Sequence, residues 1–477
     1  MTLREVFGDA APTGTTVEVA ALSLDNRRVL PGSVFCCVRG FRRDGHDFAA
    51  DAVARGAVAL VVDHPLGLGV PEIVVDDVRA AMAPAAARLH GDPTAKLRTV
   101  GVTGTNGKTT TAYLVRALLE GAGLQTGLLG TVTSIIGGVE HEVARTTPEA
   151  IDLQAAFAAM RDGGDTHCAI EVSSHALALA RADAIHWAAA IFTNLTQDHL
   201  DFHPTMEDYF AAKRRLFQAR PEVAVINIDD PYGARLAHEL DLPRVVTFAI
   251  DNPDADLRAT ELHSGFTGST FLADGLTLRS PLPGRFNVLN VLAAVATARA
   301  LGVGDESIVA ALPDAGRVPG RFEPVDEGQG YALLVDYAHT PDSLDNVLVA
   351  ARELTANRLL CVFGCGGDRD RGKRPLMGAI AARLADHAIV TSDNPRSEDP
   401  EVIVAEIMSG IDDRSASEPI VDRRAAIERA VFLARAGDVV VIAGKGHEQG
   451  QEVEDGRKLP FDDVAVAREA LRARLVA

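Results

Sequence analysis

The chain has 477 residues, 47% of them hydrophobic and 24% charged, which is enough for about three globular domains with sizeable buried cores. Its net charge of −19 argues against sequence-independent binding of nucleic acid, which needs a basic surface, and we expect no nucleic-acid partner. Local clusters of lysine and arginine can still bind anionic substrates.

The N-terminus and the cysteines bear on where the protein works. Met1–Glu5 lacks the basic segment and apolar run of a signal peptide, and no uncharged apolar stretch approaches the roughly 18 residues of a membrane span. The cysteines share no C-x-x-C spacing, which argues against a zinc site; they are Cys36, Cys37, Cys168, Cys361 and Cys365. We therefore expect a cytoplasmic protein with reduced cysteines and no membrane partner.

Two segments rich in proline and glycine predict domain boundaries. The first is Gly91–Thr94, which follows an alanine-rich helical pattern at Ala81–Leu89, and the second is Pro313–Gly320. The predicted domains span residues 1–97, 98–316 and 317–477.

The central domain opens with a strand, a glycine-rich loop and a helix. Leu97–Val102 is a short β-prone run, and the helical pattern after the loop ends at Gly121. Two later apolar runs, Trp187–Phe192 and Val223–Ile228, repeat the strand signal. Residues 256–282 alternate in polarity and contain turn glycines, which predicts an antiparallel appendage.

Beyond the second boundary, strand and helix patterns alternate. The predicted strands are Leu333–Val335, Leu359–Phe363, Ala388–Thr391 and Val439–Ala443. This order predicts a second, doubly wound parallel sheet. The fold class is therefore α/β, with a small α/β N-terminal domain, a central P-loop sheet carrying the antiparallel appendage, and a Rossmann-like C-terminal domain.

The glycine-rich loop predicts a site for nucleotide phosphates. Its glycines let backbone N–H groups converge on phosphate oxygens at a helix N-terminus, Lys108 supplies a charge for the β- and γ-phosphates, and the Thr109 hydroxyl suits Mg²⁺. The strict spacing G-x-x-x-x-G-K-[ST] fails because Val102 stands at its first position, so a turn that only caps a helix is the alternative. No N-K-x-D element is present, which favours ATP over GTP. The loop residues are Gly104, Thr105, Asn106, Gly107, Lys108, Thr109 and Thr110.

Acidic and histidine residues further along add candidate metal ligands. Glu171 ends a buried strand, where a carboxylate can bind Mg²⁺ or merely cap the next helix. Residues 194–203 hold two histidines and two aspartates, which indicate a metal or phosphate loop; the alternative is a polar surface loop. Lys213 lies on a helix beside Phe210 and Phe217, and on this pattern alone it is an ordinary solvated lysine.

These segments together resemble the Mur ligase family, the ATP-dependent amino-acid ligases of peptidoglycan synthesis. Seven motifs appear in the family's order over nearly the whole chain. They are the loop G-T-N-G-K-T, Glu171–His175, Thr196–His203, Tyr209–Lys213, Gly284–Asn290, Pro319–Glu323 and Asp336–Pro341.

The C-terminal segments resemble the MurE branch of that family, which adds the third residue of the stem peptide to UDP-N-acetylmuramoyl-L-alanyl-D-glutamate. The D-N-P-R version of one segment is similar to that of enzymes that take meso-2,6-diaminopimelate. The matching segments are Gly366–Asp370, Asp393–Arg396 with the sequence D-N-P-R, and Gly444–Glu448. The chemistry agrees, because diaminopimelate ends in a carboxylate that arginine can bind bidentately and an ammonium that Glu448 can accept.

The resemblance implies a set of site residues. The catalytic and metal-binding set is Lys108, Thr109, Glu171, His199 and a carbamylated Lys213, holding two Mg²⁺ ions. Asn287, Asn290, Arg321 and Asp336 join the loop in binding ATP. The UDP-linked substrate meets Asn26, Thr146, Thr147, Ser173 and Arg181. The diaminopimelate set is Arg369, Asp393, Asn394, Pro395, Arg396, Gly444 and Glu448.

Two positions depart from the family pattern, and several other functions stay open. Asn26 replaces the usual serine of an Asp-Ser-Arg segment, and Leu179 replaces a common glutamine.

The alternative functions are an L-lysine-adding or D-alanyl-D-alanine-adding ligase, a folylpolyglutamate synthase, or a P-loop switch protein. The D-N-P-R segment argues against the other ligases. A P-loop switch protein would not need the C-terminal motifs. We expect a monomer whose partners are ATP, the UDP-linked dipeptide and diaminopimelate.

Overall fold

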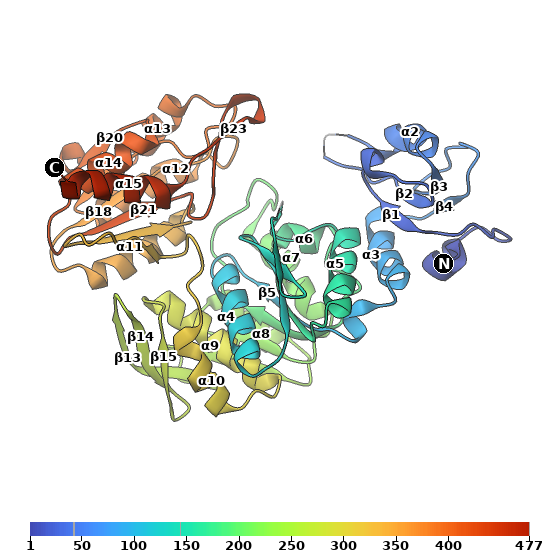
Figure 1. The fold of residues 1–477 in the computed structure, drawn as a ribbon, viewed down its shortest axis with the longest axis horizontal. Coiled ribbons are helices and arrows are strands. Elements are labelled where there is room, and N and C mark those ends of the chain that lie inside the picture. The colour runs from blue at the N-terminus through green and yellow to red at the C-terminus, as the bar shows by residue number, and fades with distance from the viewer. Residues whose placement is uncertain (42, 144, 477) are drawn as a thin grey trace.

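The computed structural model describes residues 1–41, 43–143 and 145–476, and its three large sheets divide it into three lobes. The lobes of the N-terminus and C-terminus lie at opposite ends of the molecule, with the central lobe between them (Figure 1). The predicted α/β fold class is confirmed, while the boundaries after residues 97 and 316 stay predictions. No helix of the described chain is long and apolar enough to cross a membrane.

The N-terminal lobe holds a four-stranded parallel sheet in the order β1-β2-β3-β4. Its elements are α1 (Leu3–Phe7), β1 (Ala21–Ser23), β2 (Ser33–Cys36), α2 (Ala49–Ala54), β3 (Ala57–Val62), β4 (Glu72–Val74) and α3 (Val78–Leu89). Helix α3 begins three residues before the predicted pattern because the Asp77 carboxylate caps the N–H groups of Arg79 and Ala80.

The central lobe is built on an eleven-stranded sheet in the order β15-β14-β13-β12-β11-β10-β5-β9-β6-β7-β8. Its first strands and helices are β5 (Arg98–Thr103), α4 (Lys108–Gly121), β6 (Thr126–Leu129), β7 (Ser134–Ile136), β8 (Val139–His141), α5 (Ala150–Asp162), β9 (His167–Glu171) and α6 (Ser174–Ala178). The rest are β10 (Trp187–Phe192), α7 (Met206–Gln218), β11 (Ala224–Asn227), α8 (Pro231–Glu239), β12 (Val245–Ala249), β13 (Leu257–Gly265), β14 (Gly268–Ala273), β15 (Leu276–Ser280), α9 (Arg285–Ala300) and α10 (Asp305–Ala311).

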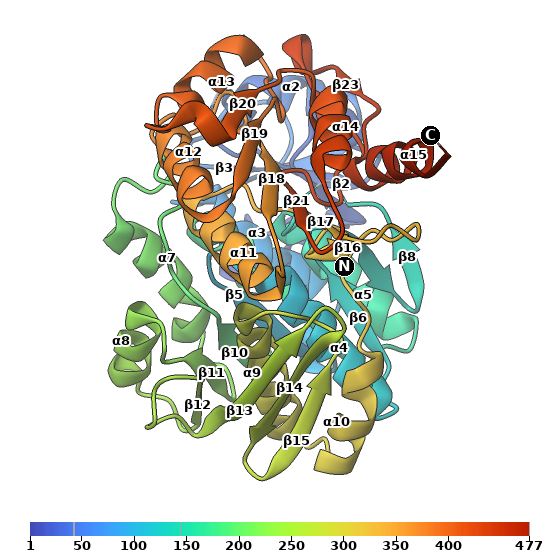
Figure 2. The same cartoon turned by 90° about the vertical axis from the view of Figure 1, so that its left-hand side faces the viewer.

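The strands from β13 to β6 pair in parallel, and antiparallel pairing extends the sheet beyond both of these strands. Strands β13, β14 and β15 form the predicted antiparallel appendage, which is confirmed. The hairpin of β7 and β8 at the other edge was not predicted. Helices α4 and α9 lie side by side on one face (Figure 1 and Figure 2), and α5 and α7 pack on the other. Both faces of the parallel strands are therefore buried, which explains their continuous apolar runs.

The C-terminal lobe contains a six-stranded sheet in the order β16-β17-β21-β18-β19-β20, in which only β16 runs antiparallel to its neighbour. The elements are β16 (Glu323–Pro324), β17 (Ala332–Asp336), α11 (Pro341–Leu354), β18 (Leu359–Phe363), α12 (Lys373–Leu384), β19 (His387–Val390), α13 (Pro400–Met408), β20 (Ser417–Pro419), α14 (Arg423–Leu433), β21 (Val439–Ala443), β22 (Gln451–Glu452), β23 (Lys458–Leu459) and α15 (Asp463–Val476). Helices cover both faces of this sheet, so the predicted doubly wound arrangement is confirmed.

A fully buried ion pair stabilises the C-terminal lobe. Arg423 donates from Nε and a terminal nitrogen to the two Asp463 oxygens at 2.8 and 2.7 Å, and also to the carbonyls of Ser392 and Ala443. Replacing Arg423 by methionine leaves a buried carboxylate without its partner, and we expect the free energy of unfolding to fall by about 3–5 kcal/mol. Denaturant titration of the purified protein measures this change.

The adjacent arginine provides the matched control. Arg424 pairs with Glu469 at the surface, where both side chains are about half exposed. We expect Arg424→Met to change the free energy of unfolding by less than about 1 kcal/mol, because water and salt screen such a pair. Equal losses in the two variants would show that the buried pair has no special role.

Candidate active site

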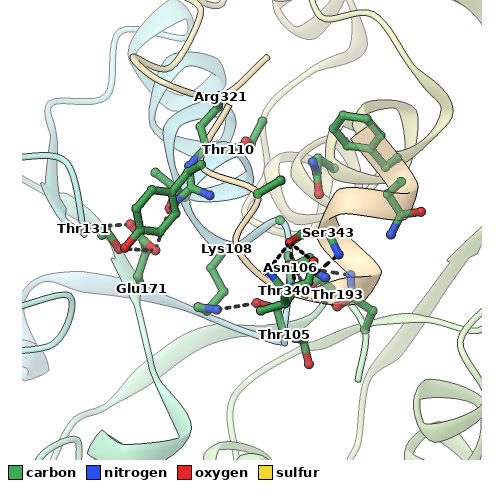
Figure 3. Close-up of a pocket in the computed structure, with 18 of the residues that line it drawn as sticks. Thr105, Asn106, Lys108, Thr110, Thr131, Glu171, Thr193, Arg321, Thr340 and Ser343 are labelled. Carbon is green, nitrogen blue, oxygen red and sulfur yellow. Dashed lines mark hydrogen bonds between the residues drawn. The ribbon is translucent and has the colours of Figure 1, made fainter. Parts of the chain in front are cut away.

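Two adjoining cavities lie where the central and C-terminal lobes meet. The first, of about 240 Å³, is lined by the phosphate loop and by residues of α9, the segment 318–321 and α11 (Figure 3). The second, of about 270 Å³, is lined mainly by the C-terminal lobe and also by His175 and the segment 197–201 of the central lobe. The two cavities share Asp198, His199, Tyr337, His339 and Thr340 in their linings, so they adjoin at these residues.

Two glycines of the phosphate loop are required by close approach and by backbone conformation. Gly107 has a φ of +83°, and a Cβ there would meet Asn290 Oδ1 at 2.3 Å. Gly104 has a φ of +154°, and its Cβ would meet Thr193 Oγ1 at 1.8 Å. Gly107 precedes α4 without any side-chain cap, so the first N–H groups of that helix stay available to an anion.

The two residues that follow β10, Thr193 and Asn194, support the phosphate loop through hydrogen bonds. Asn194 accepts a hydrogen bond at 2.9 Å from the backbone N–H of Asn106 through its side chain, and the backbone N–H of Thr105 donates to the Asn194 carbonyl, also at 2.9 Å. Thr193 donates its hydroxyl to the Asn106 carbonyl at 2.6 Å. Sequence reasoning did not assign these two supports, although Asn194 opens the polar segment that it singled out.

Lys108 and Lys213 converge on one carbonyl oxygen. Lys108 Nζ lies 3.0 Å from Gly104 O and 2.8 Å from Thr105 O, and Lys213 Nζ lies 2.6 Å from Gly104 O. Lys213 is 1% exposed and sits over the Tyr209 ring, so it is not the solvated lysine that its pattern suggested. Burial, and then the neighbouring Lys108 charge, bring the pKa of Lys213 well below its ordinary value. Its amine is thus favoured in the neutral, nucleophilic form.

Glu171 faces the phosphate loop and does not cap a helix. Its Oε2 accepts hydrogen bonds from the hydroxyls of Thr109 at 2.9 Å and Thr131 at 3.0 Å, and its Oε1 accepts from the Thr131 N–H at 2.7 Å (Figure 3). Ser173 caps the following helix α6, so the capping alternative for Glu171 is wrong. A buried carboxylate beside a threonine hydroxyl is a donor set that suits Mg²⁺.

The segment 194–203 is buried only in part: Gln197 and Asp201 are exposed, while the histidines pack against neighbouring rings, so a polar surface loop does not describe the whole segment. His203 is 4% exposed, and His199, with a φ of +55°, packs edge-on against the His175 ring. Desolvation lowers the pKa of His199 to about 3 although Asp198 at 3.4 Å opposes the shift, so the imidazole is neutral at pH 7. A neutral imidazole is the form that binds a metal.

The C-terminal lobe closes the first cavity with Arg321 and Asp336. An Arg321 terminal nitrogen donates to Thr109 Oγ1 at 3.1 Å, and the guanidinium stacks on the Tyr337 ring. Asp336 accepts hydrogen bonds from the backbone N–H groups of Phe322 at 2.6 Å and Ala338 at 2.8 Å, while burial raises its pKa to about 6. A second bond between the lobes, from Asn106 Nδ2 to Asp342 Oδ2 at 2.5 Å, was not predicted.

The predicted diaminopimelate residues gather at the second cavity. Its lining includes Arg369, Asp393, Asn394, Arg396, Gly444 and Glu448, together with Asp370 and Lys373, which sequence reasoning missed. Pro395 does not contribute to the lining. Lys445 is fully buried and does not line this cavity. It donates to Asn394 Oδ1 at 2.8 Å and to Glu448 Oε2 at 3.0 Å, which fixes these two cavity side chains.

The residues predicted for the UDP-linked substrate are more scattered. Thr146 and Ser173 line the first cavity, and Thr147 donates to the Glu171 carbonyl at 2.9 Å. Arg181 is engaged with Glu149 at 2.9 Å, and Asn26, in the N-terminal lobe, donates to Asp51 at 2.7 Å. Neither Asn26 nor Arg181 lines the two cavities.

Comparisons with known proteins agree with this geometry. Three family models match in chain order: Mur ligase family, catalytic domain, at residues 18–90; Mur ligase middle domain at 102–298; and Mur ligase, glutamate ligase domain, at 320–446.

Two relatives and one solved structure illustrate the similarity, and each bears the name UDP-N-acetylmuramoyl-L-alanyl-D-glutamate–2,6-diaminopimelate ligase. A relative from Syntrophomonas wolfei is 47% identical over 96% of each chain, and one from Streptomyces coelicolor is 47% identical over 98% of this chain and 96% of that one. A solved structure bearing the same name is 36% identical, superposes with a TM-score of 0.71, and is covered over 99% of its length by the whole of this chain.

Proposed function

The chain belongs to the Mur ligase family, and on that basis we propose that it is the ATP-dependent ligase that joins meso-2,6-diaminopimelate to UDP-N-acetylmuramoyl-L-alanyl-D-glutamate. The observation that carries this proposal is the pair of adjoining cavities. One offers a phosphate loop to ATP, the other offers two arginines and a glutamate to an amino acid, and they share His199. A P-loop switch protein would not need the second cavity.

The reaction runs in two displacements on neighbouring atoms. A carboxylate oxygen of the D-glutamate γ-carboxylate attacks the ATP γ-phosphorus, which breaks the bond to ADP and gives an acyl phosphate. The amine of diaminopimelate then attacks the acyl carbon, phosphate leaves, and the amine loses its proton. Both steps depend on positioning and on neutralising charge rather than on a protein nucleophile.

The phosphate end of the site supplies the charge. Lys108 leaves the Gly104 and Thr105 carbonyls to bind the β- and γ-phosphates, and Arg321 approaches from the C-terminal lobe beside Thr109. Thr109 and Glu171 form a donor set that fits Mg²⁺, since a hydroxyl and a carboxylate oxygen lie 2.9 Å apart in the lining of the first cavity. Bound Mg²⁺ would neutralise the transferred phosphate. Asn287, Asn290 and Asp336 complete the nucleotide site.

Lys213 is proposed to bear a carbamate that serves a second Mg²⁺ with His199. Its buried amine with a lowered pKa is a nucleophile for CO₂, and a carboxylate formed there would balance the charge of the neighbouring Lys108. Within the described residues, no carboxylate forms an ion pair with Lys213. A carbamate on Lys213 would therefore add a negative charge that the site lacks.

The remaining partners follow from the same geometry. Arg369 and Arg396 are placed to bind the distal carboxylate of diaminopimelate, and Glu448 to accept its ammonium. Thr146, Thr147, Ser173, Arg181 and Asn26 are proposed for the UDP-linked dipeptide, which would have to span from the first cavity to the N-terminal lobe. Because one chain lines both cavities, we propose a monomer acting in the cytoplasm, where ATP and nucleotide-linked precursors are available.

Coupled ADP release tests the function. Purified protein with ATP and Mg²⁺ should release ADP only when both the UDP-linked dipeptide and meso-diaminopimelate are present. Release with L-lysine in place of diaminopimelate would favour the lysine-adding relative, and release with D-alanyl-D-alanine or folyl substrates would favour the other ligases. ADP release without any acceptor would indicate a nucleotide switch.

Asp336 gives ATP binding an expected pH dependence. We propose that the Asp336 carboxylate accepts hydrogen bonds from the ribose hydroxyls of ATP. Its pKa is raised to about 6, and only the ionised form, present above that pKa, accepts two such bonds without donating. We therefore expect the KM for ATP to rise as the pH falls through about 6 and to stay level at higher pH. Asp336→Asn does not titrate and should give a higher KM with no step near that pH. A step of the same size in the asparagine variant would assign it to another group.

A further inference from the structure

A short hairpin behind the second cavity grips the segment that carries D-N-P-R. Strands β22 and β23 form this hairpin, residues 451–459. Gln451 Nε2 donates to Ser392 Oγ at 2.9 Å and to the Asp393 carbonyl at 2.6 Å, and the Glu452 N–H donates to Asn394 Oδ1 at 2.9 Å. Consecutive hairpin residues thus hold consecutive residues of the binding segment.

The last of these contacts fixes Arg396 at both its backbone and its side chain. Arg396 has a left-handed backbone with a φ of +52°, and its N–H donates to the Glu452 carbonyl at 3.1 Å. Its Nε lies 2.8 Å from Glu452 Oε2, and one terminal nitrogen donates to the Gly367 carbonyl at 2.8 Å. The second terminal nitrogen has no protein partner in the described part of the chain.

Arg396 and Glu452 have different places relative to the second cavity, so one can contact the substrate while the other orients its partner. Arg396 lines the second cavity, whereas Glu452 does not, so the carboxylate approaches the guanidinium from the side away from the cavity. A glutamate there repels an incoming carboxylate, so it does not add attraction. Its benefit is that it holds a long, flexible side chain in one conformation, with one terminal nitrogen left for the ligand.

We propose that Glu452 is a positioning residue that sets the specificity of this site for an amino acid with a distal carboxylate, by fixing the Arg396 guanidinium toward the cavity. The inference rests on the proposed function. Without this anchor, Arg396 samples conformations that point along the hairpin or into solvent, and the carboxylate of diaminopimelate has to select one of them on binding.

A double-mutant cycle on steady-state kinetics tests the proposal. Glu452→Ala should raise the KM for diaminopimelate about 10-fold and leave kcat and the KM for ATP within about 2-fold. Glu452→Gln, which keeps an acceptor for Nε, should raise it only about 3-fold. In an Arg396→Ala background, Glu452→Ala should add nothing, because the group that it orients is gone. Glu454→Ala, an exposed glutamate of the same hairpin, is the control and should match the parent protein.

The other outcomes overturn the inference. An unchanged or lower KM for diaminopimelate in Glu452→Ala would mean that Glu452 competes with the substrate or does nothing. A full additional loss in the Arg396→Ala background, or an equal rise in the KM for ATP, would mean a merely structural role. If the alanine variant does not fold, the same cycle with Glu452→Gln decides. Failure of the proposed function is seen separately, as absent diaminopimelate-dependent ADP release in the parent protein.

Discussion

Replacing Lys213 by alanine should lower kcat by about two to three orders of magnitude while the protein stays folded. The reason is the loss of the carboxylate that a carbamylated Lys213 would contribute beside the phosphate loop. Its amine is 2.6 Å from Gly104 O, buried, and has a lowered pKa, all of which favour reaction with CO₂. Steady-state ADP release with all three substrates measures the loss.

Chemical rescue separates a carbamate from a simple lysine. Acetate or formate at high concentration should restore part of the activity of Lys213→Ala, because a small carboxylate can occupy the space that the side chain leaves. Arg214→Ala, which changes the next residue on the outer side of α7, should keep nearly full activity and show no response to acetate. An alanine variant that no small carboxylate rescues at any concentration would count against the carbamate.

Replacing Lys108 by methionine should lower kcat by on the order of 10³-fold, the largest effect that we expect from one substitution. Methionine keeps the length and apolar stem of lysine, and it removes only the charge that meets the transferred phosphate. Lys108 now donates to the Gly104 and Thr105 carbonyls, so its replacement also frees the Thr105 carbonyl, whereas Gly104 O keeps the bond from Lys213. Rapid-quench measurement of the first turnover reports the chemical step directly.

The control for Lys108 is an exposed lysine at the predicted boundary between the first two domains. Lys96→Met lies just before β5, away from both cavities, and should leave kcat within about 2-fold. If Lys108→Met kept more than about a tenth of the parent activity, phosphate transfer would not depend on this charge. Arg321 would then be the next candidate for the neutralising cation.

Local patterns account for what was predictable in the fold. The strand β5, the loop and the helix α4 follow from an apolar run, two glycines and an amphipathic repeat that are contiguous in sequence. The hairpin β7–β8 escaped prediction because the residues of β8 are exposed and carry no alternating apolar face. The start of α3 was missed because a single capping residue, Asp77, decides it.

The sequence predicts which residues belong to the site, but it does not predict how they are arranged in space. Glu171 and Lys108 come from motifs, but the bond from Asn106 to Asp342 joins positions 236 apart and depends on how two lobes meet. Burial of Lys213 likewise depends on packing of α7 against β5, which reverses the expectation for a lone helical lysine. Glu452 belongs to no motif, and only its contact with Arg396 reveals it.

The most direct test of the account follows one labelled oxygen through the reaction. The UDP-linked dipeptide, with ¹⁸O in its D-glutamate γ-carboxylate, is incubated with the protein, ATP, Mg²⁺ and equal amounts of meso-diaminopimelate and L-lysine, and the products are analysed by mass spectrometry. The account predicts two products. The UDP-linked peptide gains the mass of one diaminopimelate residue, and the released phosphate carries one ¹⁸O from the carboxylate. A lysine-bearing product would contradict the substrate, and phosphate without ¹⁸O would contradict the acyl phosphate.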